Sequence, residues 1–333
     1  QAKLGYDSII KTQKQCGGDI VSGRNVPPEM LGEILTCRFK NQSIVRYQLT
    51  ENGSGFGATL AEPLIHAKHP NFRPVDCKMG PDGGIYVCDW YNLIINHARL
   101  DFRDKRRDVD HGRIWRITYK DRPLVKRPKL EGIPLPDLLD HLKAPEYWTR
   151  HQTKLVLSGM DPDRVAGALK TWSRALSPDE SDVDHHRVEA LWAYQHVNRS
   201  DPDLLKEALR ARTPEARAAA ARVIRYWWPD MKDPLELLAE ATQDESSRVR
   251  LEAVLSAGFI PRPEALPAAL RVVDQPMDRF LEHALRLTID GLKKHWEPAL
   301  EAGALTFHKP EHAARISGQR SMAQDMALSR KMK

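Results

Sequence analysis

Residues 72–92 read Phe-Arg-Pro-Val-Asp-Cys-Lys-Met-Gly-Pro-Asp-Gly-Gly-Ile-Tyr-Val-Cys-Asp-Trp-Tyr-Asn, and this stretch decides the fold of the first third of the chain. Two runs in which apolar and polar residues alternate flank a Pro-Asp-Gly-Gly sequence, which is a strong signal for a β-hairpin. Asp82 and Gly83 can adopt the positive φ angles of a tight turn. A two-residue turn at these positions pairs Cys77 with Cys88, within reach of a disulfide.

The same turn places Asp76 opposite Asp89, on the next rung and on the other face of the sheet. Two opposed carboxylates repel each other unless a positive charge lies beside them. A hard cation such as Ca²⁺ could supply that charge, with Asn92 as a further oxygen ligand. An arginine could supply it instead, and the candidates are Arg73, Arg106 and Arg107. A three-residue loop is the alternative, because it shifts the register by one and separates the aspartates.

Strand-like patterns extend through the rest of the first 120 residues. Short β-branched and aromatic runs occur at residues 44–49, 85–90 and 113–119, and turn-forming residues separate them. Prolines and basic residues crowd between 121 and 145, which is typical of a surface linker. We therefore expect a β domain over residues 1–120 and a linker over 121–145.

From residue 146 the period becomes helical, and Asp-Pro, Ser-Pro or Thr-Pro pairs punctuate it as N-cap and first helical residue. Segments around four alanines align at steps of 30, 33 and 31 residues: Ala190, Ala220, Ala253 and Ala284. Such a period predicts helix pairs stacked into an α-solenoid over residues 146–305. The units resemble HEAT repeats, and residues 306–333 have the composition of a polar tail or linker.

The hairpin resembles one blade of the β-propellers found in NHL and glucose/sorbosone dehydrogenase-type proteins. Together with residues 22–29, 52–56 and 102–118, it is similar to the end of the propeller in the membrane-bound dehydrogenase family. In that family a propeller precedes HEAT-like repeats and a c-type cytochrome domain. The resemblance implies a multidomain β + α chain: a partial propeller of two to three blades, then the solenoid. Since there is no Cys-x-x-Cys-His, the haem domain would lie downstream.

The resemblance also implies a function. Electrons from a small alcohol or sugar would pass, at a quinone or metal site on the complete propeller, to a cytochrome c domain or another acceptor in the periplasm or cell envelope. In this sequence Asp76 and Asp89 would bind the metal. Asn92, Arg106 and Arg107 would hold the cofactor. His97 and His111 are the catalytic candidates. This piece of the chain alone is expected to be inactive.

A different class of function is open as an alternative, namely a non-enzymatic scaffold with protein partners on the solenoid. The formal charge of +6 does not favour nucleic acid, because Arg103, Lys105, Arg106 and Arg107 alternate with aspartates. The sequence has no apolar run long enough for a membrane span, and GxGxxG, P-loop and HExxH motifs are absent. The substrate and the oligomeric state leave no signal in the sequence.

Overall fold

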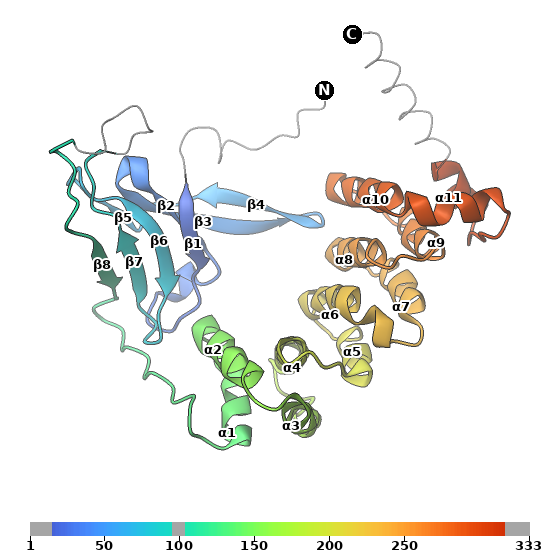
Figure 1. The fold of residues 1–333 in the computed structure, drawn as a ribbon, viewed down its shortest axis with the longest axis horizontal. Helices are drawn as coiled ribbons and strands as arrows, with labels where there is room; N and C mark the ends of the chain where they lie inside the picture. Colours follow the sequence, from blue (N-terminus) through green and yellow to red (C-terminus); the bar gives the residue numbers. More distant parts are fainter. Residues whose placement is uncertain (1–14, 95–103, 317–333) are drawn as a thin grey trace, which may run out of the picture. The chain divides into compact units, whose positions relative to one another are not determined.

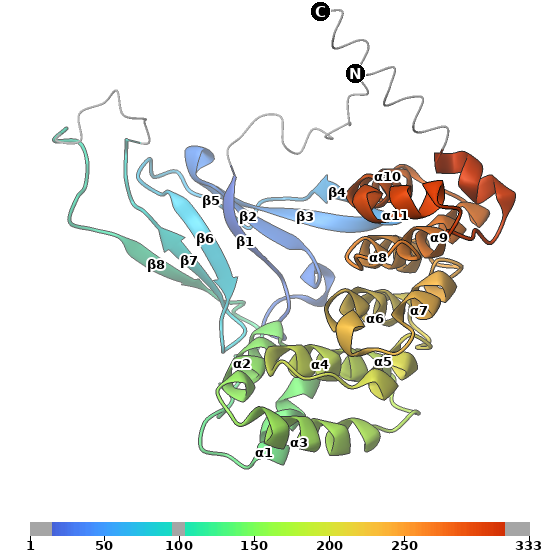
Figure 2. The same ribbon diagram turned by 45° about the vertical axis from the view of Figure 1, so that its right-hand side comes forward.

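The computed structural model describes residues 15–94 and 104–316 of the 333-residue chain. The chain divides into two compact units, which are drawn in Figures 1 and 2. The first comprises residues 1–51 and 56–159, and the second comprises residues 52–55 and 160–333.

The first unit contains two β-sheets. One sheet has five strands in the order β1-β2-β3-β4, with β5 also paired to β3, and the other has the order β6-β7-β8. The strands are β1 (Cys16–Ile20), β2 (Ile34–Arg38), β3 (Ser43–Asn52), β4 (Gly55–Leu60), β5 (Ile65–His66), β6 (Pro74–Met79), β7 (Ile85–Asp89) and β8 (Arg113–Ile117). Short 3₁₀ turns η1 (Pro28–Met30) and η2 (Phe39–Asn41) flank β2. The predicted β region is therefore correct, whereas membership of a propeller stays a prediction.

The β6–β7 hairpin forms as predicted, but with a different register. Gly83 has a φ of 78°, and the Gly80 amide donates to the Gly84 carbonyl at 2.8 Å. Three residues therefore make the loop, and Cys77 pairs with Val87 instead of Cys88. The prediction of a two-residue turn is therefore wrong by one residue, and the alternative of a three-residue loop is confirmed.

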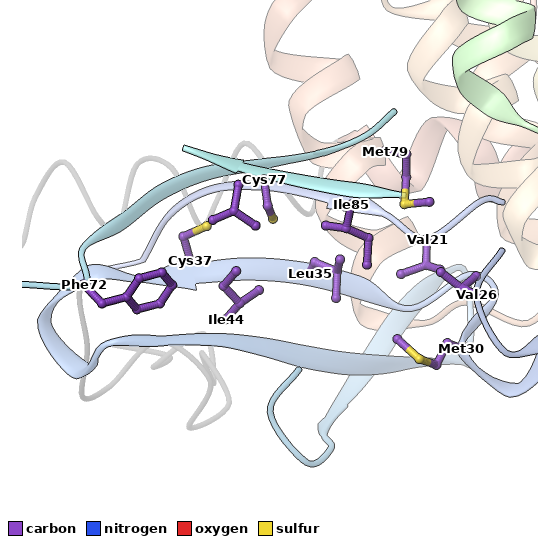
Figure 3. Packing of buried hydrophobic residues seen from close by; sticks show 11 residues of the cluster. Val21, Val26, Met30, Leu35, Cys37, Ile44, Phe72, Cys77, Met79 and Ile85 are labelled. Atoms are coloured by element: carbon purple, nitrogen blue, oxygen red, sulfur yellow. The ribbon is translucent and has the colours of Figure 1, made fainter. Parts of the chain in front are cut away.

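Both sheets contribute to one apolar core, which Figure 3 shows at close range. Leu35, Ile44 and Val87 are completely buried there. Cys77 also points into this core, whereas Cys88 is exposed on the opposite face, so the predicted proximity of these two cysteines is wrong. Contact with the Cys77 side chain, reinforced by burial, raises the pKa of the buried Cys37 thiol.

The predicted linker contains a helix. Within residues 121–145 lie α1 (Leu135–Asp140) and η3 (His141–Lys143), and the side chains of Leu138, Leu139 and Leu142 are fully buried. The next helix, α2 (Tyr147–Ser158), also belongs to the first unit, although a solenoid was expected from residue 146. Glu146, the buried residue just before α2, accepts from the Arg24 guanidinium at 2.6 and 3.0 Å. This ion pair connects the start of α2 to the β region of the first unit.

Helices make up the second unit. They are α3 (Pro162–Arg174), α4 (Val183–His196), α5 (Pro202–Ala208), α6 (Pro214–Trp227), α7 (Pro234–Ala241), α8 (Ser247–Ala257), α9 (Ala265–Leu270), α10 (Arg279–Gly291) and α11 (Lys293–Glu301), with 3₁₀ turns η4 (Trp228–Asp230) and η5 (Arg271–Asp274). Four helices begin at a predicted proline, and the Asp161 and Asp201 carboxylates accept hydrogen bonds from the first turns of α3 and α5. At Ser177–Pro178 the chain forms a turn instead.

The repeat predicted from the alanines is present. Helices α4, α6, α8 and α10 stack on one another in one layer, and α5, α7, α9 and α11 lie in a second layer (Figures 1 and 2). Ala190, Ala220 and Ala253 are fully buried in the first layer, and Ala284 is 3% exposed. None of the described helices is long and apolar enough to cross a bilayer.

Two details of the packing concern the tryptophans of the repeat region and the predicted tail. Only two tryptophans of the repeat region are buried, Trp227 and Trp296, while Trp192 and Trp228 are half-buried. Part of the predicted tail is packed, because the fully buried His312 lies 3.1 Å from Asp274 through Nε2 and Oδ1. Residues 317–333 lie outside the described part of the chain.

Candidate functional site

The two aspartates that sequence analysis paired do not meet. A bulge between Pro74 and Asp76 places Asp89 opposite Pro74, and Asp76 pairs with Cys88. Side chains alternate along a strand, so Asp76 lies on the outer face and Asp89 on the inner face. The Asp76 carboxylate is 40% exposed and lies 3.4 Å from the Lys78 ammonium. The predicted opposition of the carboxylates is therefore wrong.

Asp89 is buried, at 3% exposure, and both of its carboxylate oxygens accept hydrogen bonds. Oδ1 accepts from the backbone amides of Arg73 at 2.7 Å and Tyr91 at 2.9 Å. Oδ2 accepts from the indole Nε1 of Trp115 at 3.0 Å. Three N–H groups donate to this one carboxylate and occupy positions that a cation would need.

Arg73 supplies the positive charge beside Asp89, as one of the sequence-based alternatives proposed. Its guanidinium is buried and donates to four backbone carbonyls at 2.9–3.3 Å, those of Phe39, Lys40, Asn92 and Leu93. Burial lowers the pKa of Arg73, and the Asp89 charge opposes this effect. The arginine therefore joins η2 to the segment after β7 by hydrogen bonds to both.

Asn92 belongs to the same network. Its side chain is buried, and Oδ1 accepts from the Ile94 amide at 3.0 Å while Nδ2 donates to the Asp108 carbonyl at 3.3 Å. Arg107 reaches the same segment, with Nη1 3.5 Å from the Ile94 carbonyl. The amide of Asn92 therefore holds two chain segments together, and both of its polar atoms are used.

Arg106 and His111 contact other carboxylates than that of Asp89. Arg106 forms a surface pair with Asp104, and its Nη2 lies 2.7 Å from Oδ2. The exposed His111 ring contacts Asp108 at 2.9 Å, and this hydrogen bond lowers the pKa of the Asp108 carboxyl. His97 falls outside the described residues. The structure thus brings Arg73, Asp89 and Asn92 together, whereas Asp76, Arg106 and His111 form ion pairs of their own.

Sequence reasoning missed an aromatic and cationic group next to this network. The Arg113 guanidinium carbon lies 3.6 Å from the Tyr91 ring centroid, and the His69 ring stacks on Tyr91 at 5.8 Å. Tyr91 has a φ of 51°, a left-handed conformation that an Asp-bonded turn supports. The pairing of β7 with β8, which aligns Asp89 with Arg113, brings Trp115 near the carboxylate, and no local sequence signal announces that pairing.

The arrangement does not fit the Ca²⁺ site that the pairing of Asp76 with Asp89 suggested. Ca²⁺ needs six to eight oxygen ligands, and the Asp89 oxygens face N–H groups instead. Within residues 15–94 and 104–316 no group of three or more His, Cys, Asp or Glu side chains has a geometry that could hold a metal ion. The network is therefore a structural clamp in the part of the chain described.

The two regions of the chain match two different families. Residues 4–121 match a family described as a domain of unknown function, DUF7133. Residues 202–289 match the HEAT repeats, which confirms the HEAT-like character of the helices from α5 to α10. No curated protein matches the chain.

Proposed function

We propose that the chain is a protein-binding scaffold whose binding surface lies on the HEAT-like helices. The observation that carries the proposal is a cluster of exposed and half-buried aromatic and arginine side chains at and just after the C-terminal ends of α6 and α8. We name it the aromatic–arginine platform, and it consists of Tyr226, Trp228, Phe259, Arg225 and Arg262.

Two rings of the platform are strongly exposed to solvent. Tyr226 is 61% exposed and Phe259 is 58% exposed, although both are apolar enough to favour burial. They occupy equivalent positions, each six residues after the repeated alanine of its helix. Tyrosine, tryptophan and arginine are the residues that contribute most to protein–protein binding energy. This composition favours a protein partner over a small-molecule substrate.

Arginines hold the platform in place. The Arg225 guanidinium lies 4.7 Å from the Phe259 ring centroid and donates to the Glu252 carboxylate at 3.3 Å. The Arg262 guanidinium lies 5.5 Å from the Trp228 ring centroid. Side chains that are already ordered lose less conformational entropy when a partner binds, so the existing contacts favour tight association.

The redox activity implied by the family resemblance is less well supported. The carboxylate pair on which that prediction rested is not formed. The polar side-chain atoms of Asn92 and Arg73 form hydrogen bonds with backbone groups. Dye-linked dehydrogenase assays of the chain with alcohols and aldoses test this second candidate. Turnover that depends on Arg106 or Arg107 would favour it over the scaffold.

The scaffold proposal is tested by capturing partners on the immobilised chain and measuring the affinity of each identified partner. The double variant Tyr226→Ser/Phe259→Ser removes the two most exposed rings and is expected to weaken binding roughly 10-fold or more. Leu155→Ser is the matched control, because Leu155 is also an exposed apolar residue, at 46%, but lies on α2. Partners that bind the double variant as tightly as the unaltered chain would contradict the proposal.

A further inference from the structure

We propose that Cys37 and Cys77 are a redox pair, which closes to a disulfide between the two β-sheets of the first unit, and that Cys16 is the thiol through which this bond forms. All four cysteines of the chain are free thiols in the structure. The three that concern us lie in the first unit, so the site is independent of the scaffold surface on the HEAT-like helices.

Cys37 and Cys77 come from different sheets and meet in one core. Cys37 lies on β2, Cys77 lies on β6, and these two strands contact each other. Figure 3 shows the two side chains extending toward each other from opposite sides of the core. Their thiols are in hydrogen-bonding contact. Two thiols that already touch across packed strands are placed for a disulfide, in which the sulfur atoms are about 2.05 Å apart.

Cys16 gives this buried pair a route to the surface. Cys37 and Cys77 are 0% and 1% exposed, and thiols buried to this extent react slowly with reagents in solution. Cys16 is half-buried, lies opposite Cys37 in the β1–β2 pairing and packs against the same core. Its Sγ lies 3.8 Å from the Cys37 carbonyl oxygen and 3.7 Å from the Pro74 carbonyl oxygen.

A small disulfide such as oxidised glutathione is the oxidant. The Cys16 thiolate attacks one sulfur of the reagent, and the first glutathione thiolate leaves. The Cys37 thiolate then attacks the Cys16 sulfur of the mixed disulfide, which releases the second glutathione thiolate. Attack of the Cys77 thiolate on the Cys37 sulfur moves the bond to the buried pair and frees Cys16. Two protein thiols are oxidised, their protons pass to the two glutathione thiolates, and one glutathione disulfide is reduced.

Chain topology favours the buried pair as the final product. The segment between Cys37 and Cys77 contains β3, β4 and β5, whereas a bond between Cys16 and Cys37 would close a shorter loop between neighbouring strands. Closing the longer loop restricts the unfolded chain more. The Cys37–Cys77 bond also joins two sheets that otherwise meet through side-chain packing.

The test is peptide mapping by mass spectrometry. The chain is equilibrated with an excess of oxidised glutathione, its free thiols are blocked, and it is digested without reduction. We expect one cross-linked pair of peptides, which contain Cys37 and Cys77, while Cys16 and Cys88 carry the blocking group. This measurement on the unaltered chain decides the pairing without any variant.

Variants test the roles of the individual thiols. Cys77→Ala should abolish the cross-link. Cys88→Ala is the matched control in the same hairpin, and it should form the bond at the normal rate because the Cys88 side chain is exposed on the opposite face. Cys16→Ser should slow formation of the bond at least about 10-fold and leave its position unchanged.

Oxidation should also stabilise the β-sheets. We expect the disulfide to raise the urea midpoint of the first unit by roughly 1 M, and dithiothreitol to reverse this shift. Four free thiols after equilibration, or a cross-link at another pair of cysteines in place of Cys37 and Cys77, would overturn the proposal. An unchanged rate in Cys16→Ser would overturn the route through Cys16.

Discussion

Asp89 is a buried carboxylate whose role is architectural. Its three donors come from three different places in the first unit: the start of β6, the turn after β7, and strand β8. A charged group can remain buried when hydrogen bonds replace its hydration, and here both oxygens accept from N–H groups. The side chain thereby fixes the end of the hairpin against β8.

Replacing Asp89 by asparagine is expected to destabilise the first unit by about 1–3 kcal/mol. The amide NH₂ group cannot accept a hydrogen bond, so at least one of the three buried donors loses its partner. Asp76→Asn is the matched change on the outer face, and it should cost less than about 1 kcal/mol, since it removes only a surface ion pair. Urea unfolding monitored by tryptophan fluorescence measures both. Equal losses would refute an architectural role for Asp89.

A second residue-level prediction concerns pH and the turn residue Asp82. Burial alone would raise the pKa of Asp82, but hydrogen bonds from the Gly84 amide and Tyr86 hydroxyl and the charge of Arg116 lower it below its usual value. Because the folded pKa is depressed, the stabilisation is fully present above the unfolded pKa of about 3.9 and is lost as the pH falls through the folded pKa.

Acid unfolding of the Asp82→Asn variant should therefore depend less steeply on pH below about 4 than that of the unaltered chain. The variant should also be less stable near neutrality. Asp121→Asn, at an exposed carboxylate of the same unit, is the control and should retain the normal pH dependence. An unchanged acid profile for Asp82→Asn would show that the turn contacts contribute nothing to stability.

At the scale of elements, the features that depend on neighbouring residues alone were predictable from the sequence. The Pro-Asp-Gly-Gly turn predicts a hairpin, and proline after a capping aspartate predicts the starts of α3 and α5. The register was missed because the loop length depends on contacts from distant residues. The Val125 amide donates to the Asp82 carbonyl at 2.9 Å, and a Cβ on Gly83 would meet Val125 and Asn25 at 2.9 and 3.1 Å.

The prediction of the candidate site was wrong for the same reason. One residue of slip reverses the face on which every side chain of a strand lies, so the paired aspartates disappear with the register. Trp115 and Tyr91 could not be assigned to Asp89 without the β7–β8 pairing. The alanine repeat, in contrast, was predictable because the crowded contact between stacked helices recurs at every step.

That contact makes Ala220 intolerant of larger side chains. It is fully buried between α6 and its stacked neighbours, so Ala220→Leu is expected to destabilise the second unit by about 1–3 kcal/mol through overpacking. The adjacent Ala219→Leu should change stability by less, roughly 0.5 kcal/mol, because Ala219 is half-buried and lines a small pocket between α4 and α6. Far-UV circular dichroism during urea unfolding reports both values. A larger effect at Ala219 than at Ala220 would contradict the alignment of the repeats.

At the scale of the whole molecule, the chain contains two compact units with separate cores. The first unit buries Leu35, Ile44 and Val87 between strands, and the second buries the repeated alanines between helices. Chains with more than one domain commonly depart from two-state unfolding. The division therefore has a thermodynamic consequence that point substitutions can reveal.

We expect calorimetry to resolve two unfolding transitions, each sensitive to substitutions in only one unit. Asp89→Asn should lower the midpoint of one transition and leave the other within error, and Ala220→Leu should do the reverse. The helical signal should follow the Ala220-sensitive transition, because nine of the eleven α-helices of the described residues, α3 to α11, belong to the second unit. If both substitutions lowered a single common midpoint, the two units would unfold as one cooperative body, and a binding event on the solenoid would then stabilise the β-sheets as well.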